Sequence, residues 1–360
     1  MTPPQITTIE QLHEYLYHAM QLEHGTIPVY LTTLYSLHPG SNSDARHIIR
    51  TVAVEEMLHL SLAANVLNAV GGTPDLTKPD FVPPFPAYLP DGETDFQVDL
   101  QPFSRDAVTM FLNIERPDQP ADEESRLRPR NRPQRQLRAD GPEEFMMQFY
   151  SIGDFYAEIA RGVRYLHQQY EEGGRQLFTG DPSRQVTQEY FYSGGGELTA
   201  VTDLDSAMAA FRLISEQGEG YGGGIYDNEK ELSHYYRFQQ LQLGRYYQKG
   251  DQVGQPTGPP LDIDWGAVYP VMRNARLADY PQGSELYAAA RKFNESYADF
   301  LGFLTQAYNG HPELLIEAVW RMFEIREDIS RLMHNPVPQR HGVYGAPTFE
   351  VGNLAKGAAS

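Results

Sequence analysis

The sequence feature that most constrains the fold is a spacing that occurs twice. Glu56 and His59 stand three residues apart in 51-TVAVEEMLHLSLAANVLNAVGG-72, and Glu231 and His234 have the same spacing in 229-EKELSHYYRF-238. Residues three apart lie on one face of an α-helix, so a carboxylate and an imidazole so placed can bind one metal ion. A single Glu-x-x-His motif is more often a surface salt bridge. Its recurrence favours a metal site.

Two further carboxylates stand in apolar segments where a core would favour hydrophobic side chains. Glu23 lies in 20-MQLEHGTIPVYL-31 and Glu158 lies in 152-IGDFYAEIARGVRYL-166. The order along the chain is therefore Glu, Glu-x-x-His, Glu, Glu-x-x-His, with one entry on each of four long predicted helices. This is the ligand set of a two-metal carboxylate site in a four-helix bundle. Two divalent ions would also balance four buried carboxylates, which are otherwise costly to bury.

Helical periodicity, capping residues and Gly-Pro stops predict an all-α fold built on these helices. We expect the four long helices at about residues 7–37, 43–71, 142–173 and 227–248. A bundle of this type with one crossover has a long connection between its second and third helices, and the Pro- and Asp-rich residues 73–140 supply it. We expect the bundle with this insertion to occupy residues 1–255. Additional helices would form a C-terminal extension, residues 256–360, packed on the same domain.

Three other side chains are candidates for roles beside the metals or the substrate. Metal-bound histidines usually donate their second N–H to a carboxylate, and Glu55 can do this for His234 on the partner helix. The alternative is a solvent-facing acid. Arg161, three residues after Glu158, can meet an anionic substrate or form a structural salt bridge. Tyr30 lies seven residues after the first of the four carboxylates, on the same helix face, where it can hydrogen-bond near the metals or simply pack.

Composition and charge narrow the classes of site and partner. The 360 residues include no cysteine, so any metal must be held by His, Glu and Asp. The net charge of −19 argues against nucleic acid and anionic membranes as partners. The start of the sequence lacks a basic region followed by an apolar run, so we expect a soluble, cytoplasmic protein. The arginine-rich run from Arg126 to Arg138 can mean an anion site, but a solvated loop is the simpler interpretation.

Four segments resemble a known family: QLEHGTIPVYL, VAVEEMLHLSLAANVLNAVGGTP, FLNIERP and ISEQGEG. They are similar to the ferritin-like domain related to iminophenyl-pyruvate dimer synthases, enzymes of violacein and indolocarbazole pathways that couple two imines derived from aromatic amino acids. The resemblance covers about residues 5–250 and implies a ferritin-like four-helix bundle with a non-haem iron site. The ligands it implies are Glu23, Glu56, His59, Glu158, Glu231 and His234. It further suggests that Glu216 and Glu219 line the site.

Two functional hypotheses follow from the ligand set and the resemblance. The first is an O2-dependent oxidoreductase with two metal ions, iron or alternatively manganese, that acts on a small organic substrate. The resemblance suggests an imine or acid derived from an aromatic amino acid, in secondary metabolism, and an electron donor would be a further partner. The alternative is a ferritin-type protein that binds and oxidises iron without an organic substrate. The residues beyond the bundle argue against a storage cage, so we expect a monomer or a small homo-oligomer.

Overall fold

The computed structural model describes residues 5–91, 95–117, 149, 151–191, 195–220, 224–338 and 340–352. Within these residues the chain forms helices joined by irregular segments, with isolated β-bridges and no strand. The α-helices are α1 (Ile9–Ser36), α2 (Ser43–Ala69), α3 (Arg105–Ile114), α5 (Ile152–Glu172), α6 (Leu204–Glu219), α7 (His234–Leu243), α8 (Glu285–Ala307) and α9 (Leu314–Met333). The prediction of an all-α fold is therefore confirmed.

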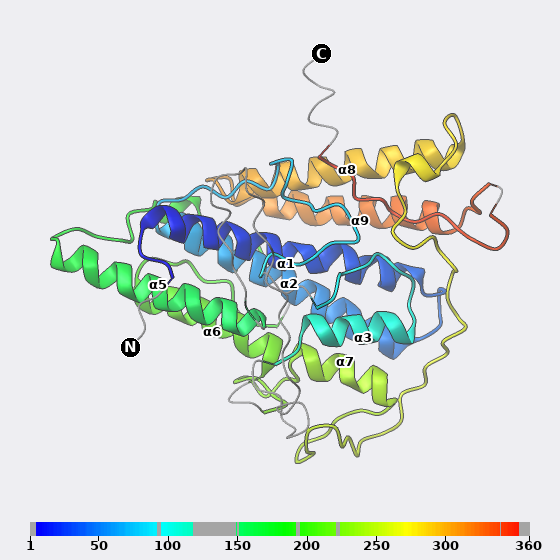
Figure 1. The fold of residues 1–360 in the computed structure, drawn as a ribbon, viewed down its shortest axis with the longest axis horizontal. Coiled ribbons are helices and arrows are strands. Elements are labelled where there is room, and N and C mark those ends of the chain that lie inside the picture. The colour runs from blue at the N-terminus through cyan, green and yellow to red at the C-terminus, as the bar shows by residue number, and fades with distance from the viewer. Residues whose placement is uncertain are drawn as a thin grey trace.

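The two longest helices, α1 and α2, lie side by side and form the centre of the molecule (Figure 1). Thr8 begins α1 as its N-cap, because its side chain accepts a hydrogen bond from the backbone N–H of Gln11 and the Gln11 side chain bonds back. Residues 19–30 of α1 and 58–69 of α2 are buried without interruption. Helices that are buried all round must be covered on both sides. The remaining helices supply these two coverings.

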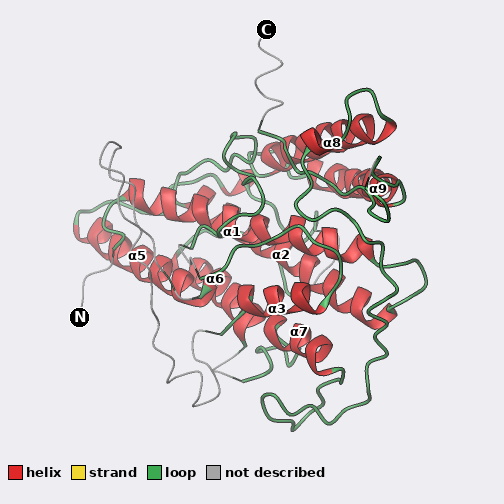
Figure 2. Cartoon of the chain, turned by 45° about the vertical axis from the view of Figure 1, so that its right-hand side comes forward, coloured by secondary structure: helices red, strands yellow, loops and turns green. Residues whose placement is uncertain are grey.

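One side of this central pair is covered by α5 and α6, which complete a four-helix bundle, and by α3 and α7. The helix α5 packs against α1 and α6, while α6 packs against α2. The shorter helices α3 and α7 pack against each other beyond the ends of α5 and α6 (Figures 1 and 2). The third and fourth positions of the bundle are thus each divided into two helices, with a break between them.

The predicted fourth long helix, residues 227–248, is wrong in extent, because only its middle part, α7, is helical. Lys230 has a φ of +69°, in the left-handed region that a helix cannot pass through, and Ser233 is the N-cap. Gly244, also at +69°, ends α7. The place of a long fourth helix beside α2 and α5 is taken instead by α6.

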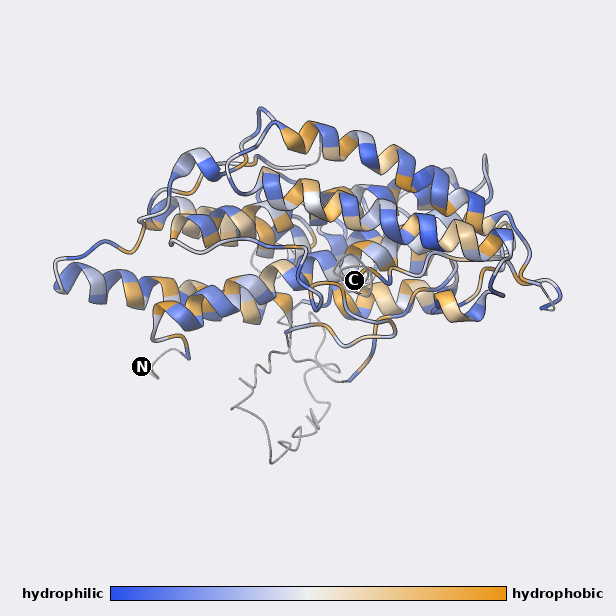
Figure 3. Cartoon of the chain, turned by 90° about the horizontal axis from the view of Figure 1, so that it is seen from above, coloured by the Kyte–Doolittle hydropathy of each residue, from blue (hydrophilic) through white to orange (hydrophobic). Residues whose placement is uncertain are grey.

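The other side of the central pair is covered by an antiparallel pair of C-terminal helices, α8 and α9 (Figure 1). They pack closely against each other, and α9 contacts α1. Hydrophobic and hydrophilic positions alternate around the helices of the molecule, as expected for elements that bury one stripe (Figure 3).

No helix in the described ranges combines the length and the apolar character needed to cross a membrane. The arginine-rich run from Arg126 to Arg138 lies outside the described residues, as does most of the second half of the 73–140 segment. The described part of that segment contains α3, whose last turn reaches the centre of the molecule.

Candidate metal centre

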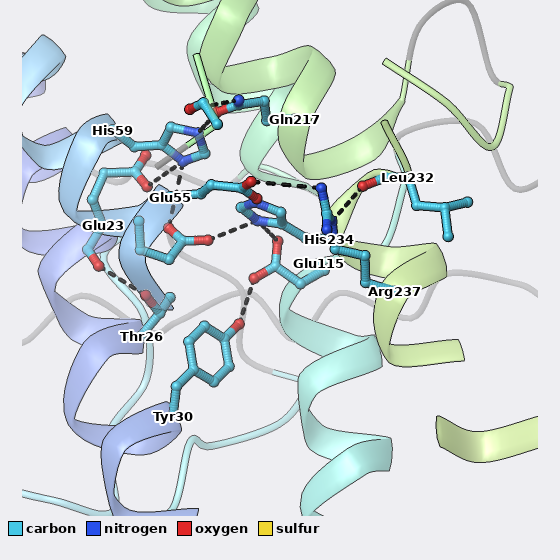
Figure 4. Close-up of polar contacts among 12 residues, drawn as sticks. Glu23, Thr26, Tyr30, Glu55, His59, Glu115, Gln217, Leu232, His234 and Arg237 are labelled. Carbon is cyan, nitrogen blue, oxygen red and sulfur yellow. Dashed lines mark hydrogen bonds and ion pairs between the residues drawn. The ribbon is translucent and has the colours of Figure 1, made fainter. Parts of the chain in front are cut away.

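Five buried side chains meet at the break between the two halves of the bundle (Figure 4). They come from four helices: α1, α2, the C-cap of α3 and the first residue of α7. The five are Glu23, Glu56, His59, Glu115 and His234, and each is at most 3% exposed. The middles of α1 and α2 and the ends of α3 and α7 make this site, so the break in the bundle is what admits Glu115 and His234 to it.

The five side chains form two triads that share Glu56. In the first, the Nδ1 atom of His59 lies 3.5 Å from Glu23 Oε2 and 3.6 Å from Glu56 Oε2. In the second, the Nδ1 atom of His234 lies 2.9 Å from Glu56 Oε1 and 3.4 Å from Glu115 Oε2. The two imidazole rings lie nearly parallel, with centroids 5.4 Å apart. One carboxylate therefore stands between two sites, with one oxygen toward each.

Each imidazole is held from its far side through Nε2. His59 Nε2 lies 2.8 Å from the amide oxygen of Gln217, and the Nε2–H2 group of Gln217 donates in turn to the carbonyl of Gly195. His234 Nε2 lies 2.9 Å from a carboxylate oxygen of Glu55. This places an Nε2–H on each ring and leaves each Nδ1 facing its triad, the arrangement typical of metal-bound histidines. The contact expected between Glu55 and His234 is present.

Glu23 and Glu115 each belong to one triad only, and we call them the terminal carboxylates. Each accepts a hydrogen bond from a buried tyrosine. Tyr156 donates to Glu23 at 2.5 Å, and Tyr30 donates to Glu115. Burial and the neighbouring carboxylates raise the pKa of both tyrosines well above its usual value. Both phenols therefore remain neutral donors, and each fixes one oxygen of its partner carboxylate.

The charges of the cluster are balanced by protons when no metal is bound. Burial and the charge of Glu56 raise the pKa of Glu23 to about 7. Burial alone would lower the pKa of His59, but hydrogen bonds to Glu23 and Glu56 outweigh it and raise this pKa to about 10. The pKa of His234 is also raised well above its usual value, chiefly by Glu115 against the effect of burial. Metal ions would displace these protons.

The donor set fits two divalent cations. His234 Nδ1 is buried and has no hydrogen-bond partner, although a carboxylate oxygen lies 2.9 Å away. A buried polar atom without a partner is costly, and a cation between these two atoms would satisfy both. Within the described residues, no Lys or Arg pairs with Glu23, Glu56 or Glu115. Imidazole and carboxylate ligands suit iron, manganese and zinc.

Two residues predicted as ligands, Glu158 and Glu231, do not lie in either triad. Glu158 stands six residues into α5, roughly 9 Å along the helix from the end that faces the cluster. Its carboxylate binds the Arg161 side chain at 2.8 Å and the Gln5 backbone N–H. Arg161 thus forms a salt bridge in this structure.

Glu231 precedes α7, so its spacing to His234 is not a helical one. Its side chain is 65% exposed and lies 3.7 Å from Arg237. The left-handed backbone at Lys230 and the start of α7 at His234 place Glu231 on a turn outside the bundle. The Glu-x-x-His pattern at this position therefore supplies one member of the cluster and not two.

Glu115 was not predicted, although it belongs to both the cluster and one of the family-like segments, FLNIERP. Its signal is weak in sequence, because a single acidic residue after a ten-residue helix is a common helix end. Tyr156 and Gln217 were likewise not predicted. Their roles depend on contacts with residues more than a hundred positions away, which no local pattern reveals.

A small cavity lies beside the cluster, between the C-terminal end of α6 and the start of α5. Its walls include Glu23, Glu56, Glu115, Gly153 and Glu219. A carboxylate oxygen of Glu219 accepts a hydrogen bond of 2.7 Å from the backbone N–H of Gly153 at the start of α5. With a volume of about 10 Å³, the cavity has room for about one water-sized molecule, which would meet the carboxylate side of the triads.

Glu216, one turn earlier on α6, does not line this cavity. Burial raises its pKa. Of the two acidic residues that the resemblance places at the site, the structure therefore brings only Glu219 to the cavity.

The shift at Glu23 predicts how the stability of the metal-free protein depends on pH. The folded pKa of about 7 exceeds the ordinary value of 4.5, so the folded state binds this proton more tightly than the unfolded state does. The contribution is full below pH 4.5 and is lost as pH rises through 7. Replacing Glu23 with Gln removes this dependence. In thermal unfolding of chelator-treated protein, the melting temperature of the Glu23→Gln variant should therefore rise relative to that of the wild type between pH 5 and pH 8. A constant difference would contradict the burial of an ionisable carboxyl group here.

Comparisons with known proteins agree with this architecture. A sequence model of the ferritin-like family matches residues 16–243, which is more than half of the chain. Dichlorochromopyrrolate synthase from Lentzea aerocolonigenes is 27% identical over 321 residues, which cover 83% of this chain and 29% of that protein. The chain thus spans less than a third of the length of this relative.

The fold also has a match among solved structures. The crystal structure of a ferritin-like protein from Caulobacter vibrioides aligns with a TM-score of 0.60 and 22% identity, over 91% of this chain and 96% of that chain. At this identity the likeness shows the fold. Since the family match extends over the helices that carry the two triads, the chain belongs to the ferritin-like family, as its sequence segments predicted.

Proposed function

We propose that this chain is an O2-dependent oxidoreductase that uses two metal ions, iron in the first place, to oxidise a small organic substrate. The observation that carries the proposal is the pair of buried triads sharing Glu56, next to a cavity. Two bound Fe(II) ions would supply electrons to O2 and positive charge to polarise it. The helices beyond the four-helix bundle, α8 and α9 among them, argue against a compact storage cage.

The residues around the metals have separable roles in this proposal. Tyr30 and Tyr156 hold the terminal carboxylates, while Glu55 and Gln217 fix the imidazoles so that Nδ1 faces the ions. The burial of the cluster keeps bulk water away from it. In the overall reaction the substrate would lose two electrons and two protons, which O2 would accept to leave as hydrogen peroxide. With a two-electron donor, O2 would instead be reduced to water.

The substrate class is proposed from the relative. The name of that protein states that it synthesises dichlorochromopyrrolate, and its similarity to this chain extends over 83% of the chain. We therefore propose an imine or acid derived from an aromatic amino acid as the substrate, in secondary metabolism. The chain corresponds to less than a third of the relative, so we propose for it only the oxidative part of such chemistry.

Metal content and oxygen uptake test the proposal together. The protein is loaded with Fe(II) without oxygen, desalted and analysed for metal, and we expect about two ions per chain. Oxygen consumption is then followed with imines and acids derived from aromatic amino acids. Consumption that rises with substrate supports the oxidase. Oxidation of added Fe(II) by a large assembly, with no effect of any organic substrate, would instead indicate a ferritin-type protein. Absence of bound metal would contradict both the oxidase and the ferritin-type hypothesis.

A further inference from the structure

A second cavity lies on the opposite side of α1 and α2 from the metal centre. It has a volume of about 430 Å³ and is enclosed by the central pair on one side and by α8 and α9 on the other. Figure 1 shows the C-terminal helices lying over α1 and α2, on the side away from α3, α5, α6 and α7. Cavities of this size hold small organic ligands in many proteins. None of the five residues of the two triads lines it.

The cavity is long, because its lining residues extend over twelve positions of each central helix. On α1 they run from His24 to Tyr35, and on α2 from Arg50 to Ser61. At 1.5 Å per residue, each span is roughly 16 Å. Between these ends the walls are apolar, formed by side chains such as Leu31, Val54 and the leucines and methionines of the other helices.

The two ends of the cavity differ in chemistry. At one end Arg50 and Arg326 line it, and both are exposed. Neither forms an ion pair with any residue in the described part of the chain. Burial and the charge of Arg326 lower the pKa of Arg46 nearby, so these guanidinium groups repel one another. In a protein of net charge −19, this concentration of positive charge at the mouth of an apolar cavity favours an anion.

The inner end of the cavity carries buried hydrogen-bonding groups. His24 is 1% exposed, and its Nε2 atom lies 2.8 Å from the hydroxyl of Tyr297. Its Nδ1 atom is buried and has no hydrogen-bond partner. Ser61 and Tyr308 form a second buried pair, with their hydroxyl oxygens 2.9 Å apart. A purely structural cavity between helices would not need an unpartnered imidazole in its wall.

We propose that this cavity binds an elongated amphipathic organic acid, with its carboxylate at Arg50 and Arg326 and its apolar body between the central helices and α8 and α9. Guanidinium groups bind carboxylates through paired N–H donors, and the apolar walls would bury the body of the ligand. A polar group at the far end of the ligand would meet His24. The site is separate from the metal centre, so the proposal does not depend on the proposed oxidase function.

Isothermal titration calorimetry tests this proposal. The metal-free protein is used, because the carboxylate of a probe could otherwise bind to a metal ion. The probes are dodecanoate and 4-phenylbutyrate, kept below the concentration at which the former aggregates, with dodecyltrimethylammonium as a cation of similar apolar length. We expect one acid to bind per chain, and the cation to bind at least roughly tenfold more weakly. Stronger binding of either acid than of the cation supports the site. The difference between the two acids shows whether the cavity prefers an acyl or an aryl body.

Variants localise the binding. Replacing both Arg50 and Arg326 with Gln should weaken it by roughly tenfold or more, since hydrogen bonds to charged groups are lost. Arg331→Gln is the matched control, because Arg331 is an exposed residue of the same helix that does not line the cavity. Ala318→Phe, which fills the cavity from α9, should abolish binding. The far-ultraviolet circular dichroism and metal content of each variant report that it has folded.

The proposal would be overturned if neither acid binds, or if the acids bind equally well to the protein without Arg50 and Arg326. Equal binding of the cation would also contradict it, because it would show a non-selective apolar void. Failure of the oxidase proposal would appear separately, as absence of metal or of substrate-dependent oxygen uptake.

Discussion

Replacing Glu56 with Gln is expected to remove both metal ions at once. Its two carboxylate oxygens face different imidazoles, with Oε1 2.9 Å from His234 Nδ1 and Oε2 3.6 Å from His59 Nδ1. Gln has the same shape, but its amide is neutral and one of its arms is a donor that cannot bind a cation. Elemental analysis after anaerobic loading with Fe(II) should show a fall from about two ions per chain to a small fraction of one.

Two other variants make this result specific. Glu23 belongs to one triad only, so Glu23→Gln should lose one ion and keep the other. Asp328 is a buried carboxylate of α9 that binds Lys292 at 2.7 Å, far from either triad in the chain, so Asp328→Asn should keep both ions. If Glu56→Gln kept one full ion per chain, the two sites would not share this carboxylate.

The second prediction tests whether Glu115, as in the structure, or Glu231, as the sequence spacing predicts, binds metal together with His234. Glu115→Ala should lose the ion held with His234, because Glu115 Oε2 lies 3.4 Å from His234 Nδ1 and no other terminal carboxylate belongs to that triad. Glu231→Ala should keep both ions, since Glu231 is 65% exposed and forms only a surface ion pair with Arg237.

The measurement is again metal content, with tyrosine absorbance as a second readout for Glu115→Ala, because Tyr30 then loses its acceptor. Thermal unfolding of both variants checks that the bundle is intact. The opposite outcome, in which Glu231→Ala loses metal and Glu115→Ala retains it, would mean that the helical spacing in the sequence is the better guide. Such a result would also require residues 227–233 to be helical in the metal-bound protein.

Part of the site could be predicted because two of its residues lie on one helix at a fixed spacing. Glu56 and His59 lie on α2, where a spacing of three fixes both side chains on one face whatever else the chain does. Glu23 could be found because a carboxylate in a continuous apolar stretch of a predicted helix needs a partner. The order of acidic residues along the chain and the long crossover favoured a four-helix bundle, and the resemblance of four sequence segments indicated its family.

The other part depended on where helices end. The same spacing at Glu231 and His234 is not helical, because a left-handed residue and an N-cap lie between or beside them, and sequence spacing cannot show that. Glu158 lies on a helix, as predicted, but α5 begins only at Ile152, and this places its end and not its middle at the cluster. Likewise, Glu115 enters the site because α3 ends there.

The sequence by itself determined the all-α fold and the carboxylate and imidazole groups of a candidate metal site. Glu23, Glu56 and His59 could be found because helical periodicity and spacing are local properties of the chain, whereas His234 was found through a spacing that is not helical in the structure. Only the tertiary structure decided that the third and fourth bundle positions are divided, that Glu115 completes the second triad, and that Tyr30, Tyr156 and Gln217 hold the ligands. These contacts join residues far apart in sequence, and their geometry depends on how the helix ends pack against α1 and α2.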